Sequence, residues 1–216
     1  MLDQEREQVA AACRRLAAEG LVPGTAGNVS ARAGEQVAIS ATGLVLSEAR
    51  PEEVSVVDLD GELVAGELAP TSELDLHLGV YRRYDAGAVV HTHAPFATAL
   101  ACVVDEVPCV HYSMLLLGGD VPVAPYATFG TPELAESVLD ALEGKAAALM
   151  ASHGAIAHGP DVDHAVETSL LLEWACQVYW RAAATGTPRV LTEEERAAVI
   201  EQAATRGYGT TKPAGS

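Results

Sequence analysis

Basic residues are scarce in this sequence. Lysine and arginine together number 13 against 30 aspartates and glutamates, and the formal net charge is −17 at neutral pH. Such a field repels the phosphate backbone of nucleic acids, and no basic cluster offsets it, so we expect no nucleic-acid partner. A small phosphorylated substrate is still compatible with this charge, because a metal ion and oriented backbone N–H groups can provide local positive potential.

Long apolar runs and paired cysteines are missing as well. No apolar stretch approaches the roughly 20 residues that cross a bilayer, and the N-terminus lacks the basic-then-apolar pattern of a signal peptide. The four cysteines form no C-x-x-C pair, which is typical of buried free thiols in a reducing compartment. We therefore expect a cytoplasmic protein that has no membrane partner.

Several common catalytic signatures are also absent. The sequence holds no Walker A motif, no dinucleotide-binding fingerprint and no G-x-S-x-G nucleophile elbow. Its only lysines are Lys145, at the start of an expected strand, and Lys212, near the C-terminus, which argues against Schiff-base chemistry. The chemistry has to be sought in other side chains.

Alternating helical and strand patterns predict one α/β domain. Hydrophobic residues form 49% of the 216 residues and charged residues 20%, values typical of a globular chain with a substantial core. Helices are expected near 3–19, 71–84, 95–103, 131–144, 162–184 and after Thr192, and strands near 37–39, 54–59, 62–64, 87–92, 107–110, 121–124, 145–150 and 155–158. We predict a single three-layer α/β/α domain over residues 1–208 and a disordered tail over 209–216.

Two histidines at the end of an apolar run are the most informative feature. His91 and His93 follow Ala88, Val89 and Val90 at spacing i, i+2. If this segment is a strand, both imidazoles project from the same face. Neutral imidazoles at the end of a buried strand suit a borderline divalent metal. A strand that merely ends in two solvated polar residues is the alternative.

His153 and Glu73 are the best partners for this pair. His153 ends an expected strand and precedes Gly154, which allows close approach, and three imidazoles with an open position describe a catalytic metal site. Glu73 follows Thr71 and Ser72 in an expected first helical turn, where it could act as a base close to the metal. The alternatives are a hydrogen-bonded strand-end histidine and a carboxylate that only complements the helix dipole.

Three short segments resemble cradles for an oxyanion. Each places a hydroxyl or amide beside a flexible turn or a helix start, which suits the binding of a phosphate group. Each could also be an ordinary turn. The segments are Gly27-Asn28-Val29-Ser30, Thr42-Gly43-Leu44 and Thr71-Ser72.

The order of these motifs resembles the class II aldolase/adducin family. The resemblance extends from about residue 5 to residue 185, and its motifs are specific as an ordered set. It implies a central mixed, largely antiparallel sheet flanked by helices, and a homotetramer with active sites at subunit interfaces. The motifs are Gly27-Asn28-Val29-Ser30, Thr42-Gly43, Pro70-Thr71-Ser72-Glu73, Val90-His91-Thr92-His93-Ala94, Pro108-Cys109-Val110-His111-Tyr112, Ala124-Pro125-Tyr126-Ala127-Thr128-Phe129-Gly130-Thr131 and His153-Gly154.

The resemblance also implies a role for individual residues. A divalent ion, Zn²⁺, would be held by His91, His93 and His153, and Glu73 would complete its resting coordination before acting as general base and acid. Tyr112 of a neighbouring subunit would exchange a proton with the aldehyde oxygen, and Tyr208 in the tail would close over the site. The implied phosphate ligands are Asn28, Thr42, Gly43, Thr71 and Ser72.

The implied reaction is metal-dependent, reversible aldol cleavage of a ketose 1-phosphate to dihydroxyacetone phosphate and a small aldehyde. L-Fuculose 1-phosphate and a 5-deoxypentulose 1-phosphate are the leading substrates. Cleavage leaves an enediolate, whose charge a metal can stabilise as a Lewis acid in place of a lysine Schiff base.

Alternatives within the same fold stay open. L-Ribulose-5-phosphate 4-epimerases resemble this chain as well: Glu73 favours an aldolase, whereas Asp120 is an acid where the aldolase pattern has an amide. A methylthioribulose-1-phosphate dehydratase would keep a similar metal site. An adducin-like interaction module would be non-enzymatic, and it would have no need for three histidines and Glu73.

Overall fold

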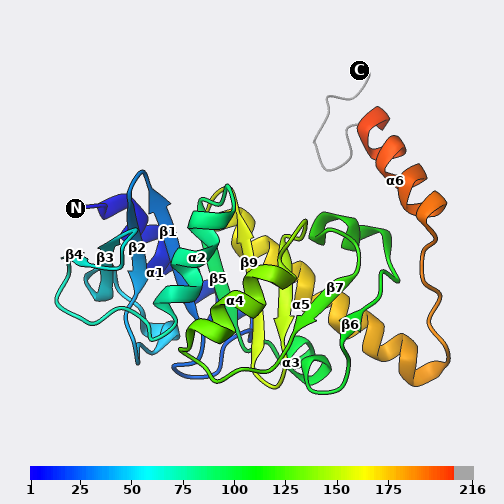
Figure 1. The fold of residues 1–216 in the computed structure, drawn as a ribbon, viewed down its shortest axis with the longest axis horizontal. Coiled ribbons are helices and arrows are strands. Elements are labelled where there is room, and N and C mark those ends of the chain that lie inside the picture. Colours follow the sequence, from blue (N-terminus) through cyan, green and yellow to red (C-terminus); the bar gives the residue numbers. More distant parts are fainter. Residues whose placement is uncertain (207–216) are drawn as a thin grey trace.

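One mixed sheet forms the centre of the molecule. The computed structural model describes residues 1–206, and within them nine strands pair in the order β4-β3-β2-β1-β5-β9-β8-β7-β6 (Figure 1). Neighbouring strands are antiparallel except for β7 and β8, which are parallel. The strands are β1 (Asn28–Ala33), β2 (Gln36–Ser40), β3 (Val54–Asp58), β4 (Leu63–Ala65), β5 (Ala88–Thr92), β6 (Glu106–Val107), β7 (Val121–Ala124), β8 (Ala147–Met150) and β9 (Gly154–Gly159).

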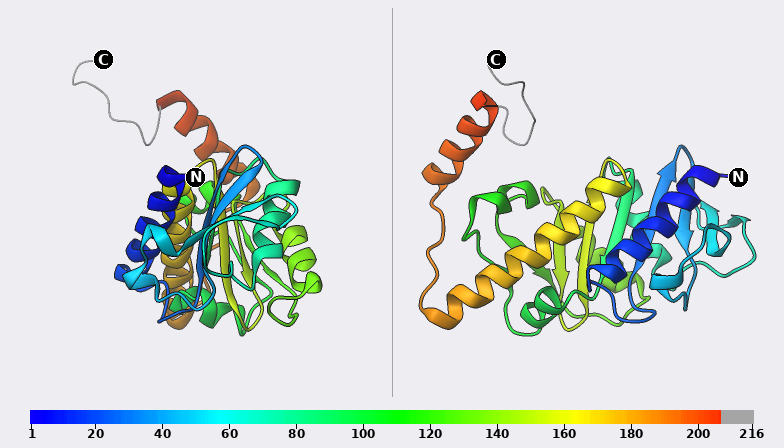
Figure 2. Two further views of the ribbon diagram at one scale, coloured as in Figure 1. Left: turned by 90° about the vertical axis from the view of Figure 1, so that its left-hand side faces the viewer. Right: turned by 180° about the vertical axis from the view of Figure 1, so that it is seen from behind.

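Helices cover both faces of this sheet. Figure 2 shows α1 and α5 on one side and α2 and α4 on the other, and α3 packs against α5. The predicted three-layer arrangement, with a largely antiparallel sheet flanked by helices, is therefore confirmed. The helices are α1 (Asp3–Ala18), α2 (Leu74–Arg83), α3 (Pro95–Ala101), α4 (Pro132–Ala141), α5 (Val162–Thr185) and α6 (Glu193–Arg206), with 3₁₀ turns η1 (Leu46–Glu48), η2 (Pro51–Glu53) and η3 (Tyr112–Leu117).

The central strands are apolar on both faces because each face is covered. In β5, Ala88 and Val90 belong to the cluster under α1, α3 and α5, whereas Val89 belongs to the cluster under α2 and α4. Side chains alternate along a strand, so His91 points to the same face as Val89. The strand therefore delivers its histidine to the side of the sheet that α2 covers.

The structure confirms several local predictions. Thr131 caps α4 by accepting a hydrogen bond from the Leu134 N–H at 3.3 Å. Thr192 and Glu195 form the predicted capping box at the start of α6, with bonds of 2.8 and 3.2 Å. Strand β7 has the predicted bounds, and β3 and β4 pair as a hairpin around Asp60 and Gly61.

Other local predictions are wrong. No strand was predicted at β1, where residues 27–30 were interpreted as an oxyanion cradle or an ordinary turn, and β1 pairs with both β2 and β5. Helix α2 begins at Leu74 rather than near residue 71, and β6 ends at Val107 rather than near residue 110. Among the cysteines, Cys102 is exposed at the C-cap of α3, so the expectation of buried thiols fails there.

Two further predictions concern membrane-spanning segments and the C-terminal tail. No helix within residues 1–206 is long and apolar enough to cross a membrane. The predicted tail 209–216 and Tyr208 lie outside the described residues.

Candidate metal centre and active site

Strand register brings the three histidines together. His91 lies in β5 between two neighbours, with Asn28 of β1 as its register partner on one side and Ile156 of β9 on the other. His93 follows directly after β5. His153 lies in the tight turn from β8 to β9, and β9 is the strand that pairs with β5. Adjacent strands thus carry residues that are about 60 positions apart in sequence to one end of the sheet.

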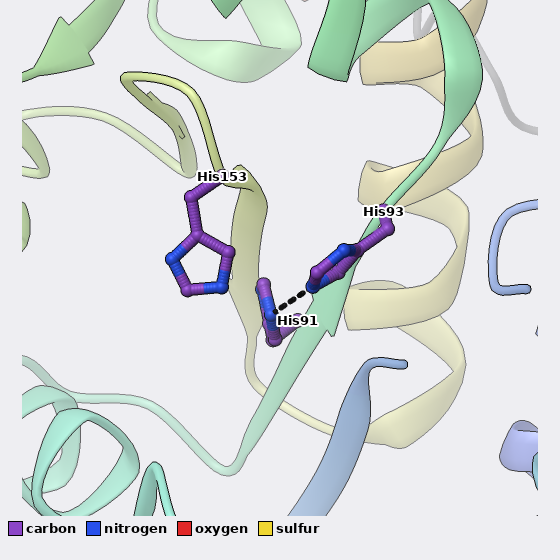
Figure 3. A group of neighbouring side chains, drawn as sticks. All are labelled: His91, His93 and His153. Atoms are coloured by element: carbon purple, nitrogen blue, oxygen red, sulfur yellow. Dashed lines mark hydrogen bonds between the residues drawn. The ribbon is translucent and has the colours of Figure 1, made fainter. Parts of the chain in front are cut away.

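The three imidazoles converge on one point. Their ligand nitrogens all lie within 4.8 Å of one another, and His91 Nε2 is 3.0 Å from His93 Nε2. Figure 3 shows the rings of His91, His93 and His153 gathered around a common centre. Their ring centroids are 4.8 to 5.1 Å apart. The predicted third histidine does join the pair.

A hydrogen bond fixes the tautomer of His91. Its Nδ1 lies 2.9 Å from the Ala155 carbonyl oxygen, which can only accept, so Nδ1 carries the proton. Its other nitrogen, Nε2, therefore faces His93 and Glu73. Metal-binding histidines are commonly oriented by such a bond from their second nitrogen.

Two glycines permit the close packing around these rings. A Cβ atom on Gly154 would lie 2.4 Å from the Thr92 carbonyl oxygen and 3.2 Å from His91 Cε1. Gly27 has φ of +89°, and a Cβ atom there would lie 2.8 Å from the His91 carbonyl oxygen. Larger residues at either position would displace the strand that carries His91.

Glu73 completes the cluster from the turn that precedes α2. Its side chain is buried, with Oε2 at 3.1 Å from His91 Nε2 and Oε1 at 3.4 Å from His153 Nε2. Asn28 Nδ2 donates to Glu73 Oε2 at 3.0 Å. Burial alone would raise the pKa of Glu73, but His91, the Asn28 bond and His153 outweigh it and lower that pKa. Glu73 is therefore a carboxylate.

These groups fit a divalent metal. Burial, followed by the neighbouring imidazoles, lowers the pKa of His93 to about 4, and it also lowers the pKa of His153. Neutral imidazoles have lone pairs available. Within the described residues, the buried Glu73 Oε1 has no hydrogen-bond partner, which is costly unless another group satisfies it. Three nitrogens and one carboxylate oxygen are a donor set that a borderline divalent cation satisfies.

A cavity of about 410 Å³ adjoins the cluster. Tyr126 and Phe129 lie at its exposed side, each with 68% of its surface accessible. The sequence motif that contains these two residues was recognised, but no role was predicted for them, and Thr25, Ala26 and Ser152 were not predicted at all. The residues that line the cavity are Thr25, Ala26, Glu73, His93, Tyr126, Ala127, Phe129, Ser152 and His153.

The segments predicted to bind phosphate lie next to one another. Ala41 and Pro70 form a bridge, the Thr42 N–H donates to the Ala69 carbonyl at 3.0 Å, and the Thr71 N–H donates to the Ser40 carbonyl at 3.1 Å. Thr42 and Gly43 line a second cavity, of about 580 Å³.

Thr71, Ser72 and Asn28 differ in what surrounds them. The hydroxyl of Thr71 accepts a hydrogen bond from the Glu73 N–H at 3.3 Å, which connects this segment to the carboxylate beside the three histidines. Ser72 is exposed, and its carbonyl oxygen lies near Gly130 of the loop that borders the first cavity. The Asn28 amide faces Glu73.

Neither Tyr112 nor Asp120 is among the residues that line the cavity at Glu73 and the histidines. Tyr112 begins η3, and its ring lies against that of His111 at a tilt of 30°, with centroids 4.5 Å apart. Asp120 accepts two hydrogen bonds from Arg196 of α6, at 2.6 and 2.9 Å, and one from the Cys109 N–H at 2.7 Å. In this chain Asp120 anchors α6 to the turn before β7.

Comparisons with known proteins agree with this arrangement. The model of the class II aldolase and adducin N-terminal domain matches residues 7–180. The chain is 39% identical over 212 residues to 5-deoxy-D-ribulose 1-phosphate aldolase of Bacillus thuringiensis serovar kurstaki, covering 97% of this chain and 99% of the relative. It is 40% identical to 5-methylthioribulose-1-phosphate/5-deoxyribulose-1-phosphate aldolase of Rhodospirillum rubrum, covering 94% of this chain and 92% of the relative.

A solved structure supports the same conclusion. The fold is similar to that of an L-fuculose 1-phosphate aldolase with a TM-score of 0.88 and 34% identity, covering 92% of this chain and 95% of the other. The family resemblance inferred from the ordered sequence motifs is thus confirmed by matches in both sequence and structure. The chain belongs to the class II aldolase and adducin family.

Proposed function

We propose that the protein is a metal-dependent aldolase that reversibly cleaves a ketose 1-phosphate to dihydroxyacetone phosphate and a small aldehyde. The observation that carries this proposal is the convergence of three imidazoles and the Glu73 carboxylate on one open cavity. The names of its relatives make 5-deoxyribulose 1-phosphate and L-fuculose 1-phosphate the leading substrates. An interaction module would have no use for this buried cluster.

His91, His93 and His153 would hold one divalent ion, which we propose to be Zn²⁺, and Glu73 would contact it when no substrate is bound. The ion supplies Lewis-acid stabilisation of the negative charge that carbon–carbon cleavage leaves on the dihydroxyacetone phosphate half. The geometry supports this assignment, because the Ala155 carbonyl orients His91 through Nδ1 and the pKa values of His93 and His153 are lowered by burial.

Glu73 would donate and remove the proton at the carbon where the bond breaks. After cleavage that carbon takes a proton, and in the reverse direction it loses one. A buried carboxylate with one unpartnered oxygen at the edge of the cavity suits both steps. We propose that Glu73 leaves its resting position on substrate binding and serves as this acid and base.

The phosphate of the substrate would bind across two adjoining segments. Thr42 and Gly43 lie beside Thr71 and Ser72 through the Ala41–Pro70 bridge, and hydroxyl and backbone N–H groups are suitable donors to phosphate. Asn28 would contribute its amide once Glu73 has moved. A phosphate at this place would leave the carbonyl end of the sugar next to the histidines.

The proton on the aldehyde oxygen would require a second subunit. Tyr112 does not line the cavity at Glu73 in its own chain, which supports a role in a neighbouring one. We therefore propose a homotetramer with active sites between subunits, in the cytoplasm. The assigned role of Tyr208 in closing the site is likewise a proposal.

Product analysis tests this function. The zinc-loaded protein is incubated separately with 5-deoxyribulose 1-phosphate, L-fuculose 1-phosphate and L-ribulose 5-phosphate. Release of dihydroxyacetone phosphate from either ketose 1-phosphate, and its loss after metal removal, would support an aldolase. Inversion at C4 without release would identify an epimerase instead, and turnover of none of the three would overturn the proposal.

A further inference from the structure

A chain of buried side chains extends behind Glu73. Tyr81 and Ser30 are linked through their hydroxyls at 2.6 Å, and Ser30 Oγ lies 2.7 Å from His77 Nδ1. His77 Nε2 lies 2.5 Å from Asn28 Oδ1, and Asn28 Nδ2 donates to Glu73 Oε2 at 3.0 Å. All five residues are buried, and His77 and Ser30 are completely inaccessible to solvent.

This chain arises from two matching periodicities. Glu73, His77 and Tyr81 are spaced four residues apart along the α2 segment, so they lie on one face of the helix. Asn28 and Ser30 are spaced two apart in β1, so they project from one face of the sheet. The polar stripe of α2 therefore faces the polar side of β1, and residues of the two elements alternate along the network.

The donor and acceptor of every hydrogen bond in this network can be assigned from Glu73, the residue at its end. A carboxylate only accepts, so Asn28 presents its NH₂ to Glu73 and its carbonyl oxygen to His77. His77 Nε2 must then carry the proton. Burial lowers the pKa of His77 to about 3, so the ring is neutral and its Nδ1 accepts from the Ser30 hydroxyl. Ser30 in turn accepts from Tyr81.

Glu73 and His77 therefore hold the Asn28 amide in one orientation from its two ends. A rotated amide would place an oxygen against the Glu73 carboxylate and an NH₂ against the N–H of His77. Both contacts would be repulsive in a buried environment, where an unmatched polar group is costly. Removing the His77 donor removes one of the two constraints on this orientation.

We propose that His77 is a positioning residue, which acts through Asn28 to hold the Glu73 carboxylate at the three histidines. With Oε2 held by Asn28, Oε1 is left for the metal and for proton transfer. The amide also stays oriented as a donor after Glu73 moves away, and this last step rests on the proposed function. His77 itself touches neither substrate nor metal.

Two substitutions of similar size separate positioning from packing. In His77→Gln the side-chain amide reaches the place of Nε2 and can still donate to Asn28. In His77→Asn the amide reaches only the place of Nδ1, next to Ser30. We expect His77→Asn to weaken Co²⁺ binding to the metal-free protein and to lower kcat by about 10–100-fold, and His77→Gln to recover most of both. A residue that only packs would show no such preference.

A double-mutant cycle tests whether the effect passes through Asn28. We expect Asn28→Ala combined with His77→Asn to match Asn28→Ala alone within about twofold in Co²⁺ affinity and kcat, because the second change removes a contact that no longer exists. His158→Asn is the matched control. It alters a half-buried histidine that donates to the Lys145 carbonyl at 3.0 Å, away from Glu73. We expect it to leave Co²⁺ affinity unchanged.

Two outcomes would overturn the proposal. One is equal Co²⁺ affinity in wild type and His77→Asn, and the other is losses that multiply in the double variant. If the protein released no dihydroxyacetone phosphate from any substrate, the proposed function would fail, whereas the Co²⁺ titrations would still decide the role of His77. Thermal melting identifies any variant that does not fold. If His77→Asn did not fold, the cycle would be repeated with His77→Ala, which also removes the donor to Asn28, and losses that multiplied in that cycle would overturn the proposal.

Discussion

The two helical layers that cover the sheet bury different kinds of side chain. The cluster under α1, α3 and α5 is hydrophobic, and the buried Ser169 of α5 bonds to the Ala165 carbonyl of its own helix. The α2 and α4 side combines a hydrophobic cluster with every buried carboxylate and imidazole within residues 1–206, namely Glu73, His77 and His91. The layer of α1, α3 and α5 chiefly stabilises the fold, while the layer of α2 and α4 covers the candidate active site.

This difference shows how a buried polar cluster can persist in a small domain. Burial of an unpaired polar group is unfavourable, so the polar residues of α2 and β1 satisfy one another through the chain from Tyr81 to Glu73. The opposite face has no such constraint and contributes apolar burial. Substitutions on the two faces should therefore have separable effects on activity and on stability.

The largest effect is expected from His93→Ala on the polar face. It removes one of three nitrogens, so we expect loss of bound metal together with a fall in kcat/KM of about 10³-fold or more, while the protein stays folded. Metal analysis of the purified variant and the release of dihydroxyacetone phosphate measure both. His164→Ala, at an exposed histidine paired with Asp161, serves as control. Full activity in His93→Ala would contradict the site.

Glu73→Gln should have the next largest effect. Glutamine keeps the size of the side chain but cannot act as a base, so we expect the three histidines to retain metal while turnover falls about 10²–10³-fold. Metal content and kcat are measured on the same preparation. Undiminished turnover would remove Glu73 from the mechanism.

Much of the fold could be predicted because its signals are local. The cap at Thr131, the capping box at Thr192 and the alternation of apolar strands depend on residues close in sequence. The pair His91 and His93 was informative for the same reason. Strand β1 was missed because its sequence, NVSARA, is rich in small and polar residues, and its pairing with β2 and β5 provides what propensity does not.

The polar network could not be predicted because its bonds join distant positions. Asn28 and Glu73 are 45 residues apart, and His77 and Asn28 are 49 apart. A lone histidine on an otherwise apolar helix stripe is indistinguishable in sequence from an ordinary core histidine. Only the register of β1 with β5, which pairs Asn28 with His91, places the hydrogen-bond network behind the three converging histidines.

On the apolar face, Leu172→Ala should reduce stability without changing the chemistry. Leu172 is 1% exposed in the cluster under α5. We expect the free energy of unfolding to fall by about 2–5 kcal/mol, because truncation loses buried surface and leaves a cavity. Urea unfolding measures the loss, and kcat per folded molecule should stay within about twofold of wild type. A kcat that fell as far as in Glu73→Gln would break the separation of the two faces.

The smallest effect, and the sharpest comparison of the two faces, concerns pH. Burial lowers the pKa of His77 to about 3 and that of His93 to about 4, whereas the unfolded chain has an ordinary value of about 6.5. The unfolded state of the metal-free protein therefore binds more protons in this interval. The stabilisation is complete above about pH 6.5 and is lost as pH falls toward the folded-state pKa values.

Urea unfolding between about pH 7.5 and 4.5 should reveal which face causes this dependence. His77→Gln has one buried imidazole fewer, so we expect its free energy of unfolding to change less steeply with pH than that of wild type. Leu172→Ala should lower the whole curve and keep the wild-type slope, because it alters no titrating group. Identical slopes in wild type and His77→Gln would mean that the buried imidazole of α2 is not a source of the pH dependence.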